Sequence, residues 1–251
     1  MRVTFEDKTV IVTGGAGGFG EAIARNFASA GATVVVADID IAKARAVADS
    51  LPSAIAVETD VTNEEAMTEL VRSAEDAYGQ LDVMVNNAGV PHRQSPMLDM
   101  DVSTVDWQFA INVRSVFLGS KLAAKSMQRT GGGVIVNTAS VAGKRPRPGL
   151  AIYNATKGAV ITLTRSLATE LGPTIRVNAV NPLVAQTGFI RNALGVDRLD
   201  EAAEAALTAN VPMGRVTQPQ DVANAVTYLA SDQAAFLTGV CLDVDGGRSI
   251  Q

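Results

Sequence analysis

Short runs of apolar, β-branched residues alternate along the chain with longer segments whose apolar residues repeat at helical spacing. Residues 10–12 and 33–37 are two such runs, each short enough to be a buried strand. Between them, residues 21–30 place their apolar side chains on one face of a predicted helix, which ends at Gly31. This alternation is typical of a parallel sheet whose two faces are both covered by helices.

The same pattern continues along the chain and predicts a single domain. Strands are expected near residues 8–13, 33–38, 54–58, 81–86, 133–139, 175–180 and 239–244. Helices are expected near residues 18–30, 41–50, 63–78, 101–129, 150–171 and 219–230. The 251 residues contain no proline- or serine-rich linker and no internal repeat beyond this alternation. We therefore predict one α/β domain over residues 1–251, with a doubly wound, seven-stranded parallel sheet of the Rossmann type between two layers of helices.

A glycine-rich turn links the first predicted strand to the first predicted helix. Residues 13–20 read Thr-Gly-Gly-Ala-Gly-Gly-Phe-Gly. Glycines let the backbone come close to a pyrophosphate, and the N-terminus of the following helix offers it unpaired N–H groups. Asp38 ends the next strand, 18 residues after Gly20, where a carboxylate accepts hydrogen bonds from a ribose diol. The sequence therefore predicts a dinucleotide site.

Asp38 also bears on the choice of cofactor. A carboxylate at this point binds the free hydroxyls of NAD and repels the 2′-phosphate of NADP. The next three residues carry no positive charge, and Lys43 is the first basic residue after Asp38. We therefore predict NAD as the cofactor.

Tyr153 and Lys157 lie four residues apart, on one face of a predicted helix, and Ser140 precedes them at the end of an apolar run. A free tyrosine has a pKa of about 10 and is a poor acid or base near neutral pH. A neighbouring ammonium favours the phenolate, so Lys157 is expected to lower the pKa of Tyr153. With the Ser140 hydroxyl holding a carbonyl oxygen, the three side chains could move a proton on and off an alcohol. A chance pair on an exposed helix face is the alternative.

Several motifs in order along the chain resemble those of the short-chain dehydrogenase/reductase family. The resemblance covers essentially the whole length. It is carried by Gly14, Gly18 and Gly20, by Asp60-Val61, by Asn86-Asn87-Ala88-Gly89, by Asn112, by Ser140, Tyr153 and Lys157, and by the Val-Asp-Gly-Gly ending at 244–247. The general sequence is also similar to that of 3-oxoacyl-acyl-carrier-protein reductases.

The resemblance implies a catalytic tetrad of Asn112, Ser140, Tyr153 and Lys157, in which Asn112 supports a water that connects Lys157 to solvent. It implies a cofactor site made of Gly14, Gly18, Phe19, Gly20, Asp38, Asp60, Val61, Asn87, Ala88, Gly89, Tyr153, Lys157, Pro182 and Thr187. It also implies a homotetramer whose helices near 101–129 and 150–171 pair between subunits. The long interruption at 183–214, with a short helix at 201–209, would be a lid over the substrate.

One segment departs from the family pattern. The family commonly has Asn-Pro-Gly-x-Val-x-Thr beside the nicotinamide, whereas residues 181–187 read Asn-Pro-Leu-Val-Ala-Gln-Thr. Leu183 accepts a positive φ far less readily than glycine, so the backbone there is expected to differ. Pro182 and Thr187 remain, and cofactor binding is expected to survive.

Composition narrows the remaining choices. The net charge of −5 gives no basic footprint for nucleic acid. No apolar run is long enough to span a membrane, and Glu6, Asp7 and Lys8 interrupt any signal-peptide core. Cys241 is the single cysteine, which excludes an intrachain disulfide, and we expect it to be buried and unreactive in the last strand. These features favour the cytosol.

Two features, His92 and the segment 143–149, allow two interpretations each, and one role is expected for Trp107. His92, the single histidine, is either a substrate contact or an exposed loop residue, and no metal site is predicted around it. Trp107 is expected to have a packing role, and the family resemblance implies that its helix packs at a subunit contact. The segment 143–149 carries Lys144, Arg145 and Arg147 between Ser140 and Tyr153. It either recognises an anionic group of the substrate, with Arg93 and Arg191 within possible reach, or is a solvated basic loop.

The sequence favours an NAD-dependent oxidoreductase that transfers hydride between NAD(H) and a secondary alcohol or ketone of a small substrate. A 3-oxoacyl-acyl-carrier-protein reductase that uses NADPH is the alternative, against which Asp38 argues. A non-catalytic NAD-binding sensor is the remote alternative, because the Asn-Ser-Tyr-Lys set is intact.

Overall fold

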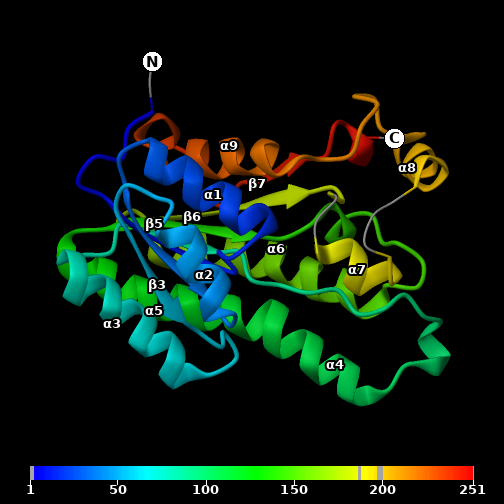
Figure 1. Cartoon of the computed structure of the whole chain (residues 1–251), viewed down its shortest axis with the longest axis horizontal. Helices are drawn as coiled ribbons and strands as arrows, with labels where there is room; N and C mark the ends of the chain where they lie inside the picture. Colours follow the sequence, from blue (N-terminus) through cyan, green and yellow to red (C-terminus); the bar gives the residue numbers. More distant parts are fainter. Residues whose placement is uncertain (1–2, 186–187, 197–199, 251) are drawn as a thin grey trace.

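A seven-stranded parallel sheet forms the centre of the molecule (Figure 1). The computed structural model describes residues 3–185, 188–196 and 200–250. The strands are β1 (Thr9–Thr13), β2 (Thr33–Asp38), β3 (Ala54–Glu58), β4 (Val83–Asn86), β5 (Gly133–Thr138), β6 (Ile175–Pro182) and β7 (Cys241–Val244). Their order is β3-β2-β1-β4-β5-β6-β7, and every neighbouring pair is parallel. The predicted fold class is confirmed.

Helices cover both faces of the sheet. They are α1 (Gly18–Ser29), α2 (Ile41–Ala48), α3 (Glu64–Tyr78), α4 (Val102–Phe109), α5 (Ser115–Thr130), α6 (Ala151–Leu171), α7 (Gly188–Leu194), α8 (Glu201–Thr208) and α9 (Pro219–Ala230). One core cluster joins α1, α2 and α9 to the sheet, and another joins α3, α5 and α6 to the opposite face. Within β1, Val10 and Val12 belong to the first cluster and Ile11 to the second, as expected when alternate side chains of a strand point to opposite faces.

The strand order reverses between the neighbouring strands β1 and β4, and this reversal explains where a ligand can bind. The chain moves outward from β1 to β2 and β3 and then crosses back to β4 on the other side of β1. The loops that follow β1 and β4 therefore leave the sheet in opposite directions and open a crevice between them. Open α/β sheets bind ligands at such a switch point, outside the carboxyl ends of the strands.

The predicted helix over 101–129 is wrong as a single α-helix. Residues 110–114 form a π-helical turn between α4 and α5, with Asn112 inside it. A π turn carries one extra residue and is common at functional sites. Its cause here is tertiary, because the Asn112 side chain bonds to Val90, Gln108 and Thr156 on three different segments. Apolar periodicity alone could not show this turn.

The segment after β6 contains one helix that the sequence did not predict and one that it did. The short helix α7 was not expected, whereas α8 lies where the periodicity of 201–209 placed it. Leu183 is buried against Val141 and Val211, and positive φ occurs at Asp7 alone among the described non-glycine residues. The expected backbone change at Leu183 thus does not involve the left-handed region.

No helix in the described part of the chain is long and apolar enough to cross a membrane.

Candidate active site

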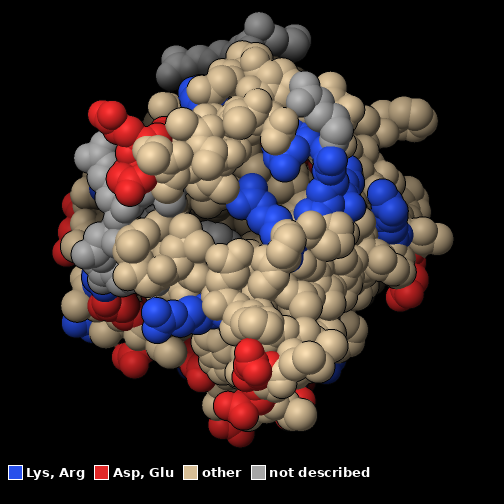
Figure 2. Space-filling model, turned by 90° about the vertical axis from the view of Figure 1, so that its right-hand side faces the viewer, with Lys and Arg blue, Asp and Glu red and all other residues tan. Residues whose placement is uncertain are grey.

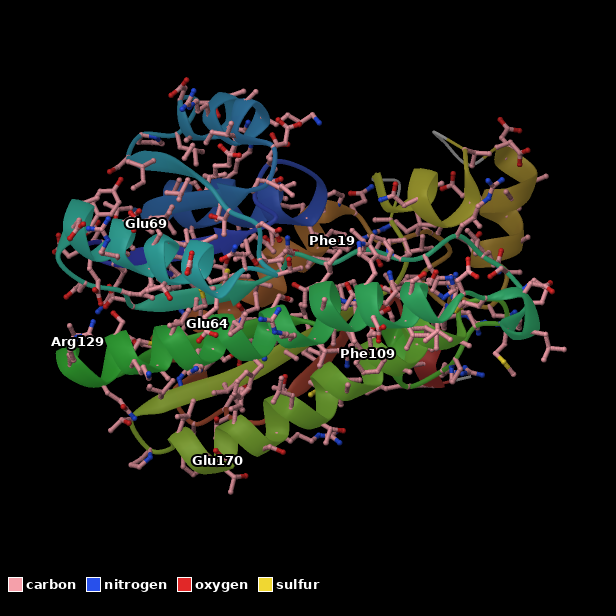
Figure 3. All side chains as sticks on the ribbon, turned by 90° about the horizontal axis from the view of Figure 1, so that it is seen from below. Phe19, Glu64, Glu69, Phe109, Arg129 and Glu170 are labelled. Atoms are coloured by element: carbon pink, nitrogen blue, oxygen red, sulfur yellow. The ribbon has the colours of Figure 1, made fainter. Side chains whose placement is uncertain are left out.

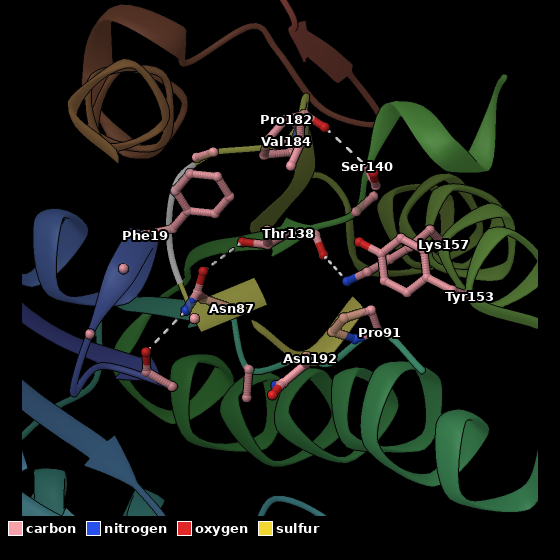
Figure 4. A pocket seen from close by; sticks show the side chains of 18 of the residues that line it. Phe19, Asn87, Pro91, Thr138, Ser140, Tyr153, Lys157, Pro182, Val184 and Asn192 are labelled. Atoms are coloured by element: carbon pink, nitrogen blue, oxygen red, sulfur yellow. Dashed lines mark hydrogen bonds between the residues drawn. The ribbon is translucent and has the colours of Figure 1, made fainter. Parts of the chain in front are cut away.

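A cavity of about 480 Å³ opens at the carboxyl ends of the central strands (Figure 4). The glycine-rich turn forms one end of it, and Ser140, Tyr153 and Lys157 lie at the other end. The loop after β4 and the segment after β6 supply the walls between them. The structure thus brings the two predicted halves of the site, cofactor-binding and catalytic, into one continuous space.

The glycine-rich turn fits a dinucleotide. Gly14 has φ 63° and Gly18 has φ 56°, values that other residues rarely adopt. A β-carbon at Gly20 would collide with the carbonyl oxygen of Gly14, so Gly20 lets α1 pack onto the turn although it does not line the cavity. The N-cap of α1 is Gly17, which has no side chain to occupy the first N–H groups of the helix. These groups are therefore available to a phosphate.

Asp38 faces the cavity from the end of β2. One carboxylate oxygen accepts the N–H of Ala16 at 3.0 Å, and the other accepts the N–H of Asp40 at 3.1 Å. These bonds fix the carboxylate beside the glycine-rich turn, where a ribose would follow the pyrophosphate. Lys43 also lines the cavity, but its ammonium lies 2.7 Å from the carboxylate of Asp40.

The loop after β4 is held to the glycine-rich turn by hydrogen bonds. The Thr13 hydroxyl accepts the N–H groups of Asn87 at 3.0 Å and Ala88 at 3.1 Å. The Asn87 amide donates to the carbonyls of Thr13 and Gly14 and accepts from Thr138. Asn87, Ala88 and Gly89 all line the cavity. Asn87 therefore fastens three strand ends together and fixes the width of the cavity.

The three catalytic candidates converge on the inner end of the cavity (Figure 4). Ser140 follows β5, and its hydroxyl accepts the N–H of Ala142 at 3.1 Å. Tyr153 and Lys157 lie one turn apart on α6, with 6% and 4% of their surfaces exposed. The Lys157 ammonium donates to the carbonyl of Thr138 at 2.8 Å and lies 5.8 Å from the centre of the Tyr153 ring.

Burial shifts the pKa values of Tyr153 and Lys157 in directions that the sequence did not show. Burial raises the pKa of Tyr153 to about 12, although a hydrogen bond with Ser140 and the positive charge of Arg147 each act to lower it. Burial lowers the pKa of Lys157 to about 8. The expected lowering of the Tyr153 pKa by Lys157 is therefore wrong for the chain alone, because loss of solvent around the phenol outweighs the nearby charges.

Asn112, the fourth catalytic candidate, does not line the cavity. Its carbonyl oxygen accepts the N–H of Val90 at 2.9 Å, and its amide donates to the carbonyl of Val90 at the same distance. A β-carbon at Gly89 would stand 3.2 Å from this carbonyl oxygen and 3.1 Å from the Lys157 ammonium. Asn112 thus anchors the loop after β4 close to Lys157. The water that would link the two side chains stays a prediction.

Only some of the remaining predicted cofactor residues line the cavity. Phe19 and Pro182 line the cavity, while Asp60 and Val61 lie outside its lining. The Asp60 carboxylate accepts two hydrogen bonds from Thr62. Binding of the cofactor by Asp60 and Val61 stays a prediction. Thr187 and the side chain of Arg191 lie outside the described residues.

His92 differs from one of its two sequence interpretations, whereas the packing of Trp107 at a subunit contact stays a prediction. His92 is 5% exposed, so its interpretation as an exposed loop residue is wrong, and it does not line the cavity. Its Nδ1 lies 2.8 Å from the carbonyl of Arg93, whereas its Nε2 has no hydrogen-bond partner in the described structure. Trp107 is 47% exposed on α4, and Cys241 is half-buried in β7, where burial raises the pKa of its thiol.

Sequence reasoning missed the residues that hold the catalytic candidates in place. The carbonyl of Thr138 receives the Lys157 ammonium, and Gln108 and Thr156 receive the amide of Asn112. The pairs of Lys157 with Thr138 and of Asn112 with Thr156 join segments that only the fold brings together, whereas Gln108 and Asn112 are four residues apart, a helical spacing that could have indicated their contact. The part of the chain that the structure describes contains no group of three His, Cys, Asp or Glu side chains that could hold a metal ion.

Comparison with known proteins agrees with this geometry. Residues 14–249 match the family model described as enoyl-(acyl carrier protein) reductase. The chain is 43% identical over 248 residues to 4-formylbenzenesulfonate dehydrogenase TsaC1/TsaC2 of Comamonas testosteroni, covering 97% of this chain and 98% of the relative. It is 38% identical over 253 residues to cis-4-hydroxycyclohexanecarboxylate dehydrogenase of Sinomonas cyclohexanicum, covering 98% of each.

A solved structure has the same fold over nearly the whole chain. It is that of 3-ketoacyl-(acyl-carrier-protein) reductase from Brucella melitensis complexed with NADH, with a TM-score of 0.91 and 38% identity. The superposition covers 98% of this chain and 100% of that one. With the family model matched over residues 14–249 and these identities over nearly full length, the chain belongs to the short-chain dehydrogenase/reductase family, whose members are oxidoreductases that use a nicotinamide cofactor.

Proposed function

We propose that this protein is an NAD-dependent dehydrogenase that interconverts a secondary alcohol and the corresponding ketone of a small molecule. The observation that carries the proposal is the shared cavity. The Asp38 carboxylate and the glycine-rich turn lie at one end, and the Ser140 hydroxyl and the Tyr153 phenol lie at the other. A dinucleotide held at the first end would reach toward the second.

Each side chain has a distinct task in the oxidation. Ser140 would hold the hydroxyl oxygen of the substrate, and the phenolate of Tyr153 would accept its proton. Lys157, fixed by the carbonyl of Thr138, would hold the ribose and keep positive charge close to Tyr153. Asn112 would support the water behind Lys157. A bound nicotinamide would supply the hydride acceptor, and its positive charge in the oxidised form would favour the phenolate of Tyr153.

The cofactor choice has support from two directions. Asp38 offers a negative charge where NADP carries a phosphate, and Lys43, the first basic residue after it in the chain, is paired with Asp40. The similar Brucella melitensis protein was solved with NADH. We propose NAD on these grounds.

The relatives also bear on the substrate. Their names specify a benzene ring with a formyl group opposite a sulfonate, and a cyclohexane ring with a hydroxyl group opposite a carboxylate. Both molecules place an acid group several bonds from the carbon that is oxidised. We propose that a small organic acid of this kind is the substrate.

Reduction of a 3-oxoacyl-acyl-carrier-protein is the second candidate. It is favoured by the structural likeness to the Brucella melitensis reductase, at a TM-score of 0.91. Preference for NADPH in such a reaction would conflict with Asp38 at the end of β2. A non-catalytic sensor is disfavoured, because Ser140, Tyr153 and Lys157 all face the cavity.

The test is a panel of secondary alcohols and ketones, assayed by the absorbance of the reduced nicotinamide. We expect turnover with NAD for alcohols that carry an acid group, and with NADH for the matching ketones. Turnover of acetoacetyl-acyl-carrier-protein with NADPH alone would select the second candidate. Binding of NAD without turnover of any panel member would contradict the assignment as a dehydrogenase.

A homotetramer is proposed for the assembled protein. Four large apolar side chains are exposed along α4 and α5, namely Val102, Trp107, Phe109 and Phe117. Figure 3 shows α4 beside α6 from below, with Phe109 labelled. Exposed apolar side chains of this size are typical of an interface between subunits. We expect light scattering at micromolar concentration to give four times the mass of the 26.1 kDa chain, and a monomer would contradict the proposal.

A further inference from the structure

Only one of the three basic side chains in the loop 143–149 faces the cavity. The Lys144 ammonium lies 2.7 Å from the carboxylate of Asp243, and the Arg145 guanidinium donates to the carbonyl of Arg248 at 2.9 Å. Both side chains are exposed and are occupied in tying the loop to the C-terminal segment. Arg147, by contrast, is half-buried and lines the same cavity as Ser140 and Tyr153.

The backbone around Arg147 is held firmly against the catalytic helix. Its carbonyl accepts the Asn154 amide at 2.9 Å, and Asn154 is the residue after Tyr153. The carbonyl of Pro148, next in the chain, accepts the Gln94 amide at 2.9 Å. Arg147 therefore has a fixed position relative to Tyr153, as a group that selects a substrate requires.

A second arginine adds positive charge at this point. Arg248 lies close enough to Arg147 for its charge, together with burial, to lower the pKa of Arg147. The turn that contains Arg248 is fixed by the buried carboxylate of Asp245, which accepts the N–H groups of Gly247 at 2.9 Å and Ser249 at 2.7 Å. Figure 2 shows Lys and Arg side chains gathered around a hollow on the face formed by the right-hand end of Figure 1.

The two guanidinium groups have no acidic partner among the described residues. None of the ion pairs of the described structure includes Arg147 or Arg248, although the chain carries 26 acidic side chains against 21 basic ones. A half-buried charge beside a like charge is unfavourable unless something compensates it. An anion that enters the cavity would supply this compensation.

We propose that Arg147, supported by Arg248, is the specificity-determining residue that binds the carboxylate or sulfonate of the substrate, an inference that rests on the proposed dehydrogenase function. The guanidinium fork matches the two oxygens of such a group. The cofactor phosphates belong at the glycine-rich turn, at the opposite end of the cavity from Tyr153. Arg147 is thus left for the substrate, whose acid group and reacting alcohol would bridge Arg147 and Tyr153.

The test compares 4-hydroxycyclohexanecarboxylate with its carboxamide, which has nearly the same shape and no charge. In the wild-type enzyme with NAD, we expect kcat/KM to be higher for the carboxylate. Arg147→Gln should reduce the ratio of the two kcat/KM values by about 10- to 100-fold, the loss of one charge-assisted hydrogen-bonded pair. Because Arg147 also influences Tyr153, the ratio is the readout and the activity with the amide alone is not.

Two further variants test whether the acid group is bound by the planar guanidinium of Arg147 or simply by positive charge nearby. Arg147→Lys keeps the charge without the fork and should give an intermediate ratio. Arg145→Gln removes the same charge from the exposed part of the same loop and should change the ratio less than about threefold. A ratio unchanged in Arg147→Gln, or one that falls equally in Arg145→Gln, would overturn the proposal.

A binding measurement distinguishes failure of this inference from failure of the proposed function. Titration calorimetry of the enzyme saturated with NADH would compare benzoate with benzamide. We expect benzoate to bind at least about tenfold more tightly to the wild type, and Arg147→Gln to abolish this difference. Anion binding without turnover of any alcohol would contradict the dehydrogenase function alone. Turnover of neutral alcohols would contradict the role of Arg147 alone if the wild type preferred neither 4-hydroxycyclohexanecarboxylate over its carboxamide nor benzoate over benzamide.

Discussion

Replacing Tyr153 with phenylalanine is expected to lower turnover by at least about a hundredfold while leaving NAD binding nearly unchanged. General acid–base catalysis by a positioned side chain contributes roughly 10²- to 10⁴-fold to a rate. The phenol is the single group lining the described cavity that both forms a hydrogen bond with the Ser140 hydroxyl and, once ionised, can accept an alcohol proton. Phenylalanine keeps the ring and removes this function.

The measurement is kcat with the best alcohol of the panel, together with NAD affinity from fluorescence titration. Thermal unfolding followed by circular dichroism checks that the variant is folded. Ser140→Ala is the matched variant, because it removes the hydroxyl that holds the substrate oxygen and leaves the phenol in place. It should retain more activity than Tyr153→Phe only if Tyr153 itself transfers the proton. Retention of most activity by Tyr153→Phe would mean that the proton transfer is assigned to the wrong residue.

NAD is expected to outperform NADP by at least about thirtyfold in kcat/KM. Two unit charges at about 4 Å repel each other by ~4 kcal/mol near a protein surface. Half of this repulsion, ~2 kcal/mol, already corresponds to roughly thirtyfold. The carboxylate of Asp38 is held in place by the N–H groups of Ala16 and Asp40, so it cannot easily turn away from a phosphate.

The preference for NAD over NADP should decrease when the negative charge of Asp38 is replaced by a positive charge beside it. Asp38→Ala combined with Ile39→Arg removes the carboxylate and adds a cation at a side chain that is 69% exposed. Asp38→Asn is the control, because it removes the charge and keeps an oxygen that can accept an N–H group. We expect Asp38→Asn to reduce the preference for NAD over NADP without reversing it. Comparable catalytic efficiency of the wild type with both cofactors would refute the assignment of NAD.

Much of the fold could be read from the sequence, because each element depends on residues close to it in the chain. The β-branched runs became β1 and β2, and the predicted helix at 219–230 is α9 within its observed bounds. The glycine-rich turn was also predictable, since positive φ values at Gly14 and Gly18 follow from residue type. The spacing of Tyr153 and Lys157 placed both on one face of α6 for the same reason.

The sequence by itself thus determined the parallel α/β fold, the dinucleotide turn and the identity of the catalytic candidates. Tertiary structure alone decided the electrostatics of the site. Burial, which depends on every segment packed around a residue, raised the pKa of Tyr153 and lowered that of Lys157. Contacts between remote segments widened the helix at Asn112 into a π turn, and they directed Arg147, of three neighbouring cations, into the cavity. Backbone conformation follows from local neighbours, whereas solvation and charge pairing follow from which distant residues the fold brings together.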